Sequence, residues 1–180
     1  KGLVAKDTST ARAVVIALHL VNTLGLVAGG ALTAWWARER ERSVGARVRP
    51  GFLVAVIVGL VLVGASGAIT ALGDTLFPMP VADGAGLFAN IVQDISMAQH
   101  FLVRLRILHP IFAVLVGFYI LVWGLTVERR TQSGSLGYLA NALVWSVALQ
   151  LMLGVLNVLL HAPGWMQIVH LLVADLVWVV

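Results

Sequence analysis

The stretch GFLVAVIVGLVLVGASGAITAL, residues 51–72, has no charged side chain and is long enough to cross a bilayer as one α-helix. Four further stretches are predominantly apolar, at about residues 10–36, 97–126, 136–160 and 164–180. The 180-residue chain is 60% hydrophobic and 11% charged, whereas soluble domains have about 25% charged residues. The sequence therefore predicts an all-α integral membrane protein with five transmembrane spans.

The connections between the spans predict how they are grouped. The spans within residues 51–180 follow one another through two tight turns and an outer loop at 73–96, which favours an up-down four-helix transmembrane bundle. The span within residues 1–36 is left over. We expect it to be the last helix of a preceding four-helix half, joined to the bundle by the linker 37–50.

Charges in the connections predict the orientation of the chain. The linker 37–50 carries five arginines against two glutamates, and the turn 127–135 carries two arginines against one glutamate. The loop 73–96 has three aspartates and no lysine or arginine. Since basic loops stay on the cytoplasmic side, we expect a multi-pass protein of the cytoplasmic membrane, with loops 37–50 and 127–135 inside and loop 73–96 outside. Topology thus explains the formal net charge of +4, and no nucleic-acid partner is expected.

Three histidines, His19, His109 and His170, lie within otherwise apolar spans. An ionisable side chain in a bilayer costs about 3 kcal/mol or more, so it usually has a partner or a function. His19 and His109 each lie about 25 Å from an inner boundary by helix rise, and His170 about 9 Å below the outer turn, so all three occupy the outer third of the membrane. Histidines on facing helices are common axial ligands of haem iron. For His109 and His170, which share one bundle, ligation and hydrogen bonding within the core both stay open.

Two neighbouring features bear on a haem site. Arg106 lies on roughly the same helix face as His109, where it can meet a haem propionate, extend to the interface or pair with an aspartate of the outer loop. The small residues 64–68 can lie against a porphyrin or serve close helix packing alone. His100 is expected at or beyond the membrane surface and His161 in a turn, so solvation explains both better than ligation.

Polar residues inside the last two spans have two readings. Asp175 is five residues after His170 and therefore lies on another face of its helix. It can handle protons, or it can form hydrogen bonds with Asn141, Gln150 or Asn157 of the neighbouring span.

The chain contains no cysteine, which excludes disulfides, thiolate ligation of haem, iron–sulfur clusters and cysteine-based zinc sites within it. It starts at Lys1, and its final apolar span stops at Val180, short of the usual spanning length. We therefore expect the chain to be part of a longer polypeptide.

Several local strings, in order along nearly the whole chain, resemble the haem A synthase family, from that family's fourth helix to its eighth. The strings are ALHLVNTL (17–24) with TAWW (33–36), GASGAITALGDTLFP (64–78), LRILHP (105–110), LGVLNVLL (153–160) and VHLLVADLVW (169–178). Two features depart from the family: Pro110 follows His109 where many relatives have arginine, and the cysteine pairs found in some members are missing.

The resemblance implies an eight-helix oxidoreductase that oxidises a porphyrin methyl of haem O to the formyl of haem A, for cytochrome oxidase. It implies a haem b with iron held by His109 and His170, with Arg106 as a further contact, and a substrate haem O whose iron meets His19. The catalytic glutamate of the family belongs to a helix that precedes this chain, so no catalytic residue is expected here. The implied partners are haem O, membrane lipids and haem O synthase, and self-association stays open.

Two other functions remain compatible with the residues. A bis-histidine cytochrome b of the membrane would transfer electrons only, for example between a quinone and a protein partner. A membrane scaffold without enzymatic activity would use its histidines as hydrogen-bonded core residues. Haem content separates these functions from a synthase.

Overall fold

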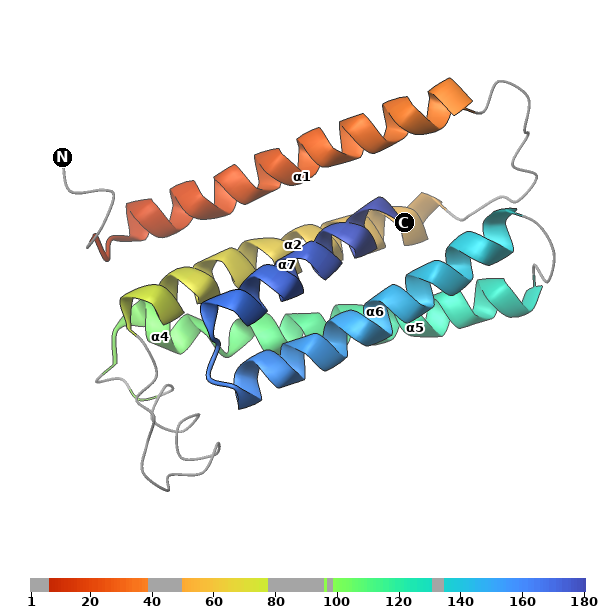
Figure 1. Ribbon diagram of the computed structural model, residues 1–180. Helices are drawn as coiled ribbons and strands as arrows, with labels where there is room; N and C mark the ends of the chain where they lie inside the picture. The colour runs from red at the N-terminus through yellow and green to blue at the C-terminus, as the bar shows by residue number, and fades with distance from the viewer. Residues whose placement is uncertain (1–6, 39–49, 78–95, 97–98, 131–134) are drawn as a thin grey trace.

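The computed structural model describes residues 7–38, 50–77, 96, 99–130 and 135–180, and the regular structure in these ranges is entirely helical (Figure 1). The helices are α1 (Thr10–Arg38), α2 (Pro50–Leu76), α4 (Phe101–Leu105), α5 (Leu108–Arg130), α6 (Ser135–Leu159) and α7 (Gly164–Val179). Four segments are long and apolar enough to cross a membrane: Thr10–Ala37, Pro50–Leu76, Phe101–Val127 and Gly137–Leu159. The predicted class, an all-α membrane protein, is confirmed. The linker 37–50 and the outer loop 73–96 lie largely outside the described residues, so their sidedness stays a prediction.

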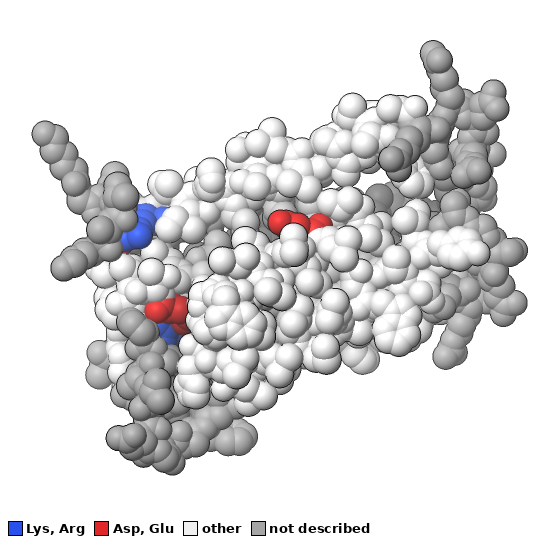
Figure 2. Space-filling model, viewed as in Figure 1, with Lys and Arg blue, Asp and Glu red and all other residues white. Residues whose placement is uncertain are grey.

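Four helices enclose one apolar core. Val56 of α2, Ile120 of α5, Val147 of α6 and Val177 of α7 are buried in a single cluster. Many other large apolar side chains face outward, and the face drawn in Figure 2 is largely uncharged, with basic and acidic side chains near one end and an acidic group near its middle. An apolar exterior of this kind suits lipid rather than water. The predicted bundle of the second to fifth spans is therefore present.

Glycines set the spacing between the helices of this bundle. A Cβ atom at Gly59 of α2 would lie 3.0 Å from Val116 of α5, and one at Gly124 of α5 would lie 2.7 Å from Val144 of α6. Lipid tails are as apolar as the side chains, so close van der Waals contact, rather than escape from water, stabilises helix pairs in a membrane. The missing side chains permit that contact.

The first helix packs against the bundle on α2 and α7 (Figure 1). Leu20 and Leu24 of α1 approach Gly64 of α2, and the indole Nε1 of Trp178 in α7 donates a hydrogen bond of 2.9 Å to the Leu24 carbonyl. At its start, Ser9 caps α1 by accepting a hydrogen bond from the Arg12 amide. Asp7 accepts the Ser9 amide proton, and this hydrogen bond lowers the pKa of the Asp7 carboxyl group.

The predicted span 97–126 is interrupted in the structure between α4 and α5. Pro110 has no amide proton to donate to the Arg106 carbonyl, and its ring clashes with a carbonyl four residues earlier in a regular helix. Arg106 therefore ends α4 as its C-cap, and α5 begins at Leu108. The break places His109 in the first turn of a new helix.

The turn between α6 and α7 uses two left-handed residues. His161 has φ of 60° and Ala162 has φ of 53°. The amide of Ala162 donates to the Asn157 carbonyl at 2.8 Å, which closes the end of α6. Residues with a Cβ atom adopt this conformation at a cost of about 1 kcal/mol.

Replacing Ala162 by glycine should stabilise the protein, because glycine adopts the left-handed conformation without the steric cost. We expect a gain of about 0.5–1 kcal/mol in the free energy of unfolding, measured by thermal unfolding in mild detergent. Ala140→Gly, in the buried interior of α6, is the control and should destabilise the protein. A lower midpoint for Ala162→Gly would contradict the expectation.

Candidate functional site

His109, the second residue of α5, directs its ring at α2. Its Nδ1 atom lies 3.2 Å from the Val63 carbonyl oxygen and 3.3 Å from the Ser66 hydroxyl oxygen. The Ser66 hydroxyl itself donates to the Val63 carbonyl at 2.9 Å. Because a carbonyl oxygen can only accept, Nδ1 carries the ring proton and Nε2 keeps its lone pair. The imidazole is thus fixed in the form that can ligate a metal through Nε2.

Gly67 makes room for this ring. A Cβ atom at position 67 would lie 2.9 Å from the Cε1 atom of His109 and 3.2 Å from its Nδ1 atom. Any larger residue must push the imidazole away from the Val63 carbonyl. The glycine in the small-residue run 64–68 is therefore required by the histidine as well as by helix packing.

His170 approaches the same site from α7. Its Nε2 atom lies 3.1 Å from the side-chain Nε2 atom of Gln150, and its Cε1 atom would lie 3.3 Å from a Cβ atom at Gly154 of α6. The Nδ1 atom of His170 is buried and has no hydrogen-bond partner among the described residues, and the same holds for the Oε1 atom of Gln150. Buried polar atoms normally have partners, so these two mark a place where a partner is missing.

The two imidazoles, from α5 and α7, lie close together in an edge-on arrangement. Their ring centroids are 6.4 Å apart, and the ring planes cross at 87°. Metal–imidazole nitrogen bonds are about 2 Å long and the ring centre lies roughly 1 Å behind the nitrogen, so two axial imidazoles on one metal have centres about 6 Å apart. The observed separation therefore suits two ligands of one metal atom.

The composition of the site suits haem better than a bare metal ion. Within the described ranges no cluster of three or more histidine, cysteine, aspartate or glutamate side chains could hold a metal ion. A structural zinc site takes four protein ligands and a catalytic one three, whereas haem iron needs only axial ligands because the porphyrin supplies the others. A haem fits three features of the site. These are the pair of imidazoles, the glycines that contact both rings, and the buried polar atoms of His170 and Gln150 that have no hydrogen-bond partner among the described residues.

Arg106 is engaged at the end of α2. Its Nε atom lies 2.8 Å from the Asp74 carboxylate, and its guanidinium donates to the carbonyls of Gly73, at 2.7 Å, and Phe77. Only 7% of the Arg106 side chain and 13% of the Asp74 side chain are exposed. The pairing with an aspartate, one of the alternatives stated from the sequence, is thus present. A contact with a haem propionate stays a prediction.

The other histidines lie apart from the pair His109 and His170. His19 of α1 is exposed, and its ring has no hydrogen-bond partner among the described residues. His100 is the N-cap of α4, where its Nδ1 atom accepts the Leu102 amide proton at 3.3 Å, and its ring stacks on Phe77. This structural role replaces the simple solvation expected for His100. His161 lies exposed in the turn before α7, as expected.

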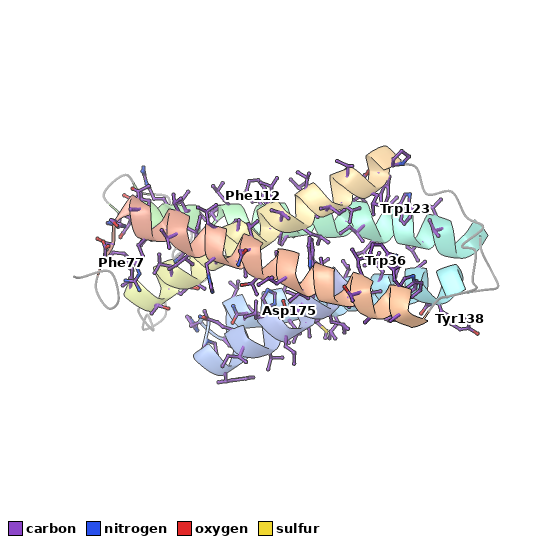
Figure 3. The ribbon with its side chains drawn as sticks, turned by 90° about the horizontal axis from the view of Figure 1, so that it is seen from above. Trp36, Phe77, Phe112, Trp123, Tyr138 and Asp175 are labelled. Atoms are coloured by element: carbon purple, nitrogen blue, oxygen red, sulfur yellow. The ribbon has the colours of Figure 1, made fainter. Side chains whose placement is uncertain are left out.

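Asp175 lies on α7, which contacts α1 (Figure 3). The described residues provide no hydrogen bond to its carboxylate, and the suggested partner Gln150 bonds to His170 instead. The prediction that Asp175 can form a hydrogen bond with Gln150 is therefore wrong. A proton-handling role for Asp175 stays a prediction.

Three residues of the site carry roles that the sequence analysis did not assign. Val63 acts through its backbone carbonyl. Every residue type has this group, so the sequence does not reveal the role. Gln150 was considered only as a partner of Asp175. Gly154 was overlooked, although a glycine inside an apolar span, one helical turn from a glutamine, is a signal for close approach of another residue.

These observations define the class of protein: an α-helical multi-pass membrane protein whose four-helix bundle brings two imidazoles close together, edge-on to each other. The model of one family, described as cytochrome oxidase assembly protein (COX15-CtaA), matches residues 2–180. The chain therefore belongs to this family, the haem A synthase family. The resemblance noted from the sequence strings is confirmed.

Two proteins from different strains of Thermus thermophilus, both named protoheme IX farnesyltransferase, are similar to the chain. One is 45% identical and the other 44% identical, each over 181 residues. Each match covers 98% of this chain but only 29% of the relative. The chain thus spans less than a third of the length of these relatives. No solved structure matches it.

Gly67→Ala should displace His109 from the Val63 carbonyl. The added Cβ atom cannot fit at 2.9 Å from the ring, and overpacking of this kind costs about 1–3 kcal/mol. Thermal unfolding in detergent measures the loss. Gly25→Ala in α1, where a Cβ atom meets nothing within 4 Å, is the matched control and should be neutral or slightly stabilising. Equal midpoints for the two variants would refute the steric role of Gly67.

Asp74→Ala should destabilise the protein by about 3 kcal/mol, because it leaves the buried Arg106 guanidinium without its carboxylate. Adding Arg106→Leu to this variant should restore part of the lost stability, since no uncompensated charge then remains. Thermal unfolding of the two single variants and the double variant checks this. Strictly additive losses would show that the ion pair contributes nothing.

Proposed function

We propose that the protein containing this chain is a haem A synthase, which oxidises a porphyrin methyl group of haem O to the formyl group of haem A. The observation that carries the proposal is the pair His109 and His170, whose ring centroids lie 6.4 Å apart in a member of the haem A synthase family. In this proposal the pair holds a haem b, and His19 meets the iron of the substrate haem.

In this proposal, the residues of the chain bind haem b and orient it. His109 offers Nε2 because the Val63 carbonyl and the Ser66 hydroxyl hold its proton on Nδ1. His170 lies close by on α7, and Gly67 and Gly154 keep the space beside both rings free of side chains. When bound, haem b supplies one-electron transfer, which the oxidation of a substrate methyl group requires.

The position of His19 supports a second haem on a separate surface. The side chain is exposed on α1, while Leu20 and Leu24 of the same helix approach α2. A haem against His19 would therefore lie on the side of α1 away from α2, and further residues must complete its site. No residue of this chain is proposed to be catalytic.

The names of the relatives support the choice of substrate. Both are named for the transfer of a farnesyl group to protohaem IX, and a farnesylated haem is the substrate proposed here. This supports a partnership with a haem O synthase. The proposed place is the cytoplasmic membrane, with the basic linker 37–50 inside and the loop 73–96 outside, on the charge distribution alone.

The first experiment is a reduced-minus-oxidised visible spectrum of the purified full-length protein, with the extracted haems separated by chromatography. Low-spin haem b together with haem O or haem A is expected. Haem b alone would favour a cytochrome that only transfers electrons. A gently prepared sample without haem would refute the proposal and leave the histidines as core residues.

Single alanine variants test which haem each histidine binds. His109→Ala and His170→Ala should each abolish the low-spin haem b spectrum, because each removes one axial ligand. His19→Ala should retain that spectrum while the conversion of haem O to haem A falls by about 100-fold or more. Loss of the haem b signal in His19→Ala, with retention in His170→Ala, would reverse the assignment.

A further inference from the structure

The histidines His109 and His170 are held in unequal ways. His109 uses only Nδ1, so its Nε2 atom has no hydrogen-bond partner among the described residues. His170 instead uses Nε2, which lies 3.1 Å from the side-chain nitrogen of Gln150. Because a carboxamide nitrogen can only donate, the lone pair on Nε2 of His170 is already engaged.

We propose that Gln150 is a positioning residue for His170. Its carboxamide keeps a hydrogen bond to the Nε2 atom of His170 until iron replaces it, and haem therefore attaches to His109 first. The inference rests on the haem b site proposed above. An axial bond needs the lone pair of an imidazole nitrogen, and His109 offers one at once. His170 must first give up its hydrogen bond to Gln150. The exchange moves no proton and no electron: the amide protons stay on Gln150, and the lone pair of His170 passes from a hydrogen bond to iron.

The remaining polar atoms of Gln150 and His170 allow the Gln150 carboxamide to form a different hydrogen bond with the same ring. The Oε1 atom of Gln150 is a buried acceptor and the Nδ1 atom of His170 is a buried donor, and in the part of the chain that the structure describes neither has a hydrogen-bond partner. Once released from Nε2, the carboxamide can accept the Nδ1 proton through Oε1. Between the two ring nitrogens lies Cε1, the atom that Gly154 leaves uncovered by a side chain. A hydrogen bond on the second nitrogen of a ligating histidine orients the ring and raises its basicity.

The test follows haem loading in time. Haem-free full-length protein in mild detergent is mixed with haem b, and the visible absorbance is recorded. The wild type should show a fast phase with the high-spin spectrum of one axial histidine, then a slower phase with the low-spin spectrum of two. His170→Ala should stop after the fast phase, and His109→Ala should lack it.

Two variants of Gln150 should change the slow phase in opposite directions. Gln150→Leu removes the donor and should speed this phase roughly fivefold, the effect of losing one hydrogen bond. Gln150→Glu either donates its acid proton to Nε2 or, when ionised, accepts a proton that then sits on Nε2, and in both cases iron must displace a stronger hydrogen bond. This variant should therefore slow the phase at least as much. A merely structural effect on packing would shift both variants the same way.

Asn157→Leu is the matched control. Asn157 is another buried carboxamide on α6, two turns beyond Gln150, and it has no hydrogen bond to His170. Its loading rates should equal those of the wild type. Gln150 variants that load at wild-type rates, or that both shift in one direction, would overturn the inference while leaving the haem site intact. A wild type that never becomes low-spin would overturn the haem site as well.

Discussion

The close approach of α2 to α5 at Gly67 is the constraint on which the site depends. It brings the Val63 carbonyl within 3.2 Å of the His109 ring, which fixes the ring proton on Nδ1. The position of that ring then sets the 6.4 Å separation from His170. A single Cβ atom at position 67 would displace the imidazole. The spacing between α2 and α5 therefore determines where the His109 imidazole lies.

On the other side of the break before Pro110, the end of α4 is also joined to α2. There Arg106 pairs with Asp74 and donates to the carbonyls of Gly73 and Phe77 at the end of α2, and the Gly73 carbonyl also accepts the Phe77 amide. A buried ion pair of this kind adds little net stability but is costly to break from one side. Together with the hydrogen bonds of His109, it holds the chain against α2 on both sides of the break, at the end of α4 and at the start of α5.

Sequence reasoning reached the class of fold because apolar length alone decides it, and it paired His109 with His170 because helix rise converts residue number into depth. It could not say which side chains meet across helices, since that depends on rotation and register between segments far apart in the chain. Gln150 shows the difference: the sequence placed it in its span and named it only as one of three alternative partners of Asp175, whereas its carboxamide contacts His170. The break before α5 also went unpredicted, although the backbone chemistry of Pro110 explains it.

The hydrogen bond from Trp178 to the Leu24 carbonyl has a mechanical consequence. It joins the helix that carries His170 to the helix that carries His19, in surroundings where no water competes for either group. Sliding of α1 along its axis must therefore either break this bond or draw α7 with it. A displacement of the helix that carries His19 is therefore opposed by a contact with the helix that carries His170, at the cost of about one hydrogen bond.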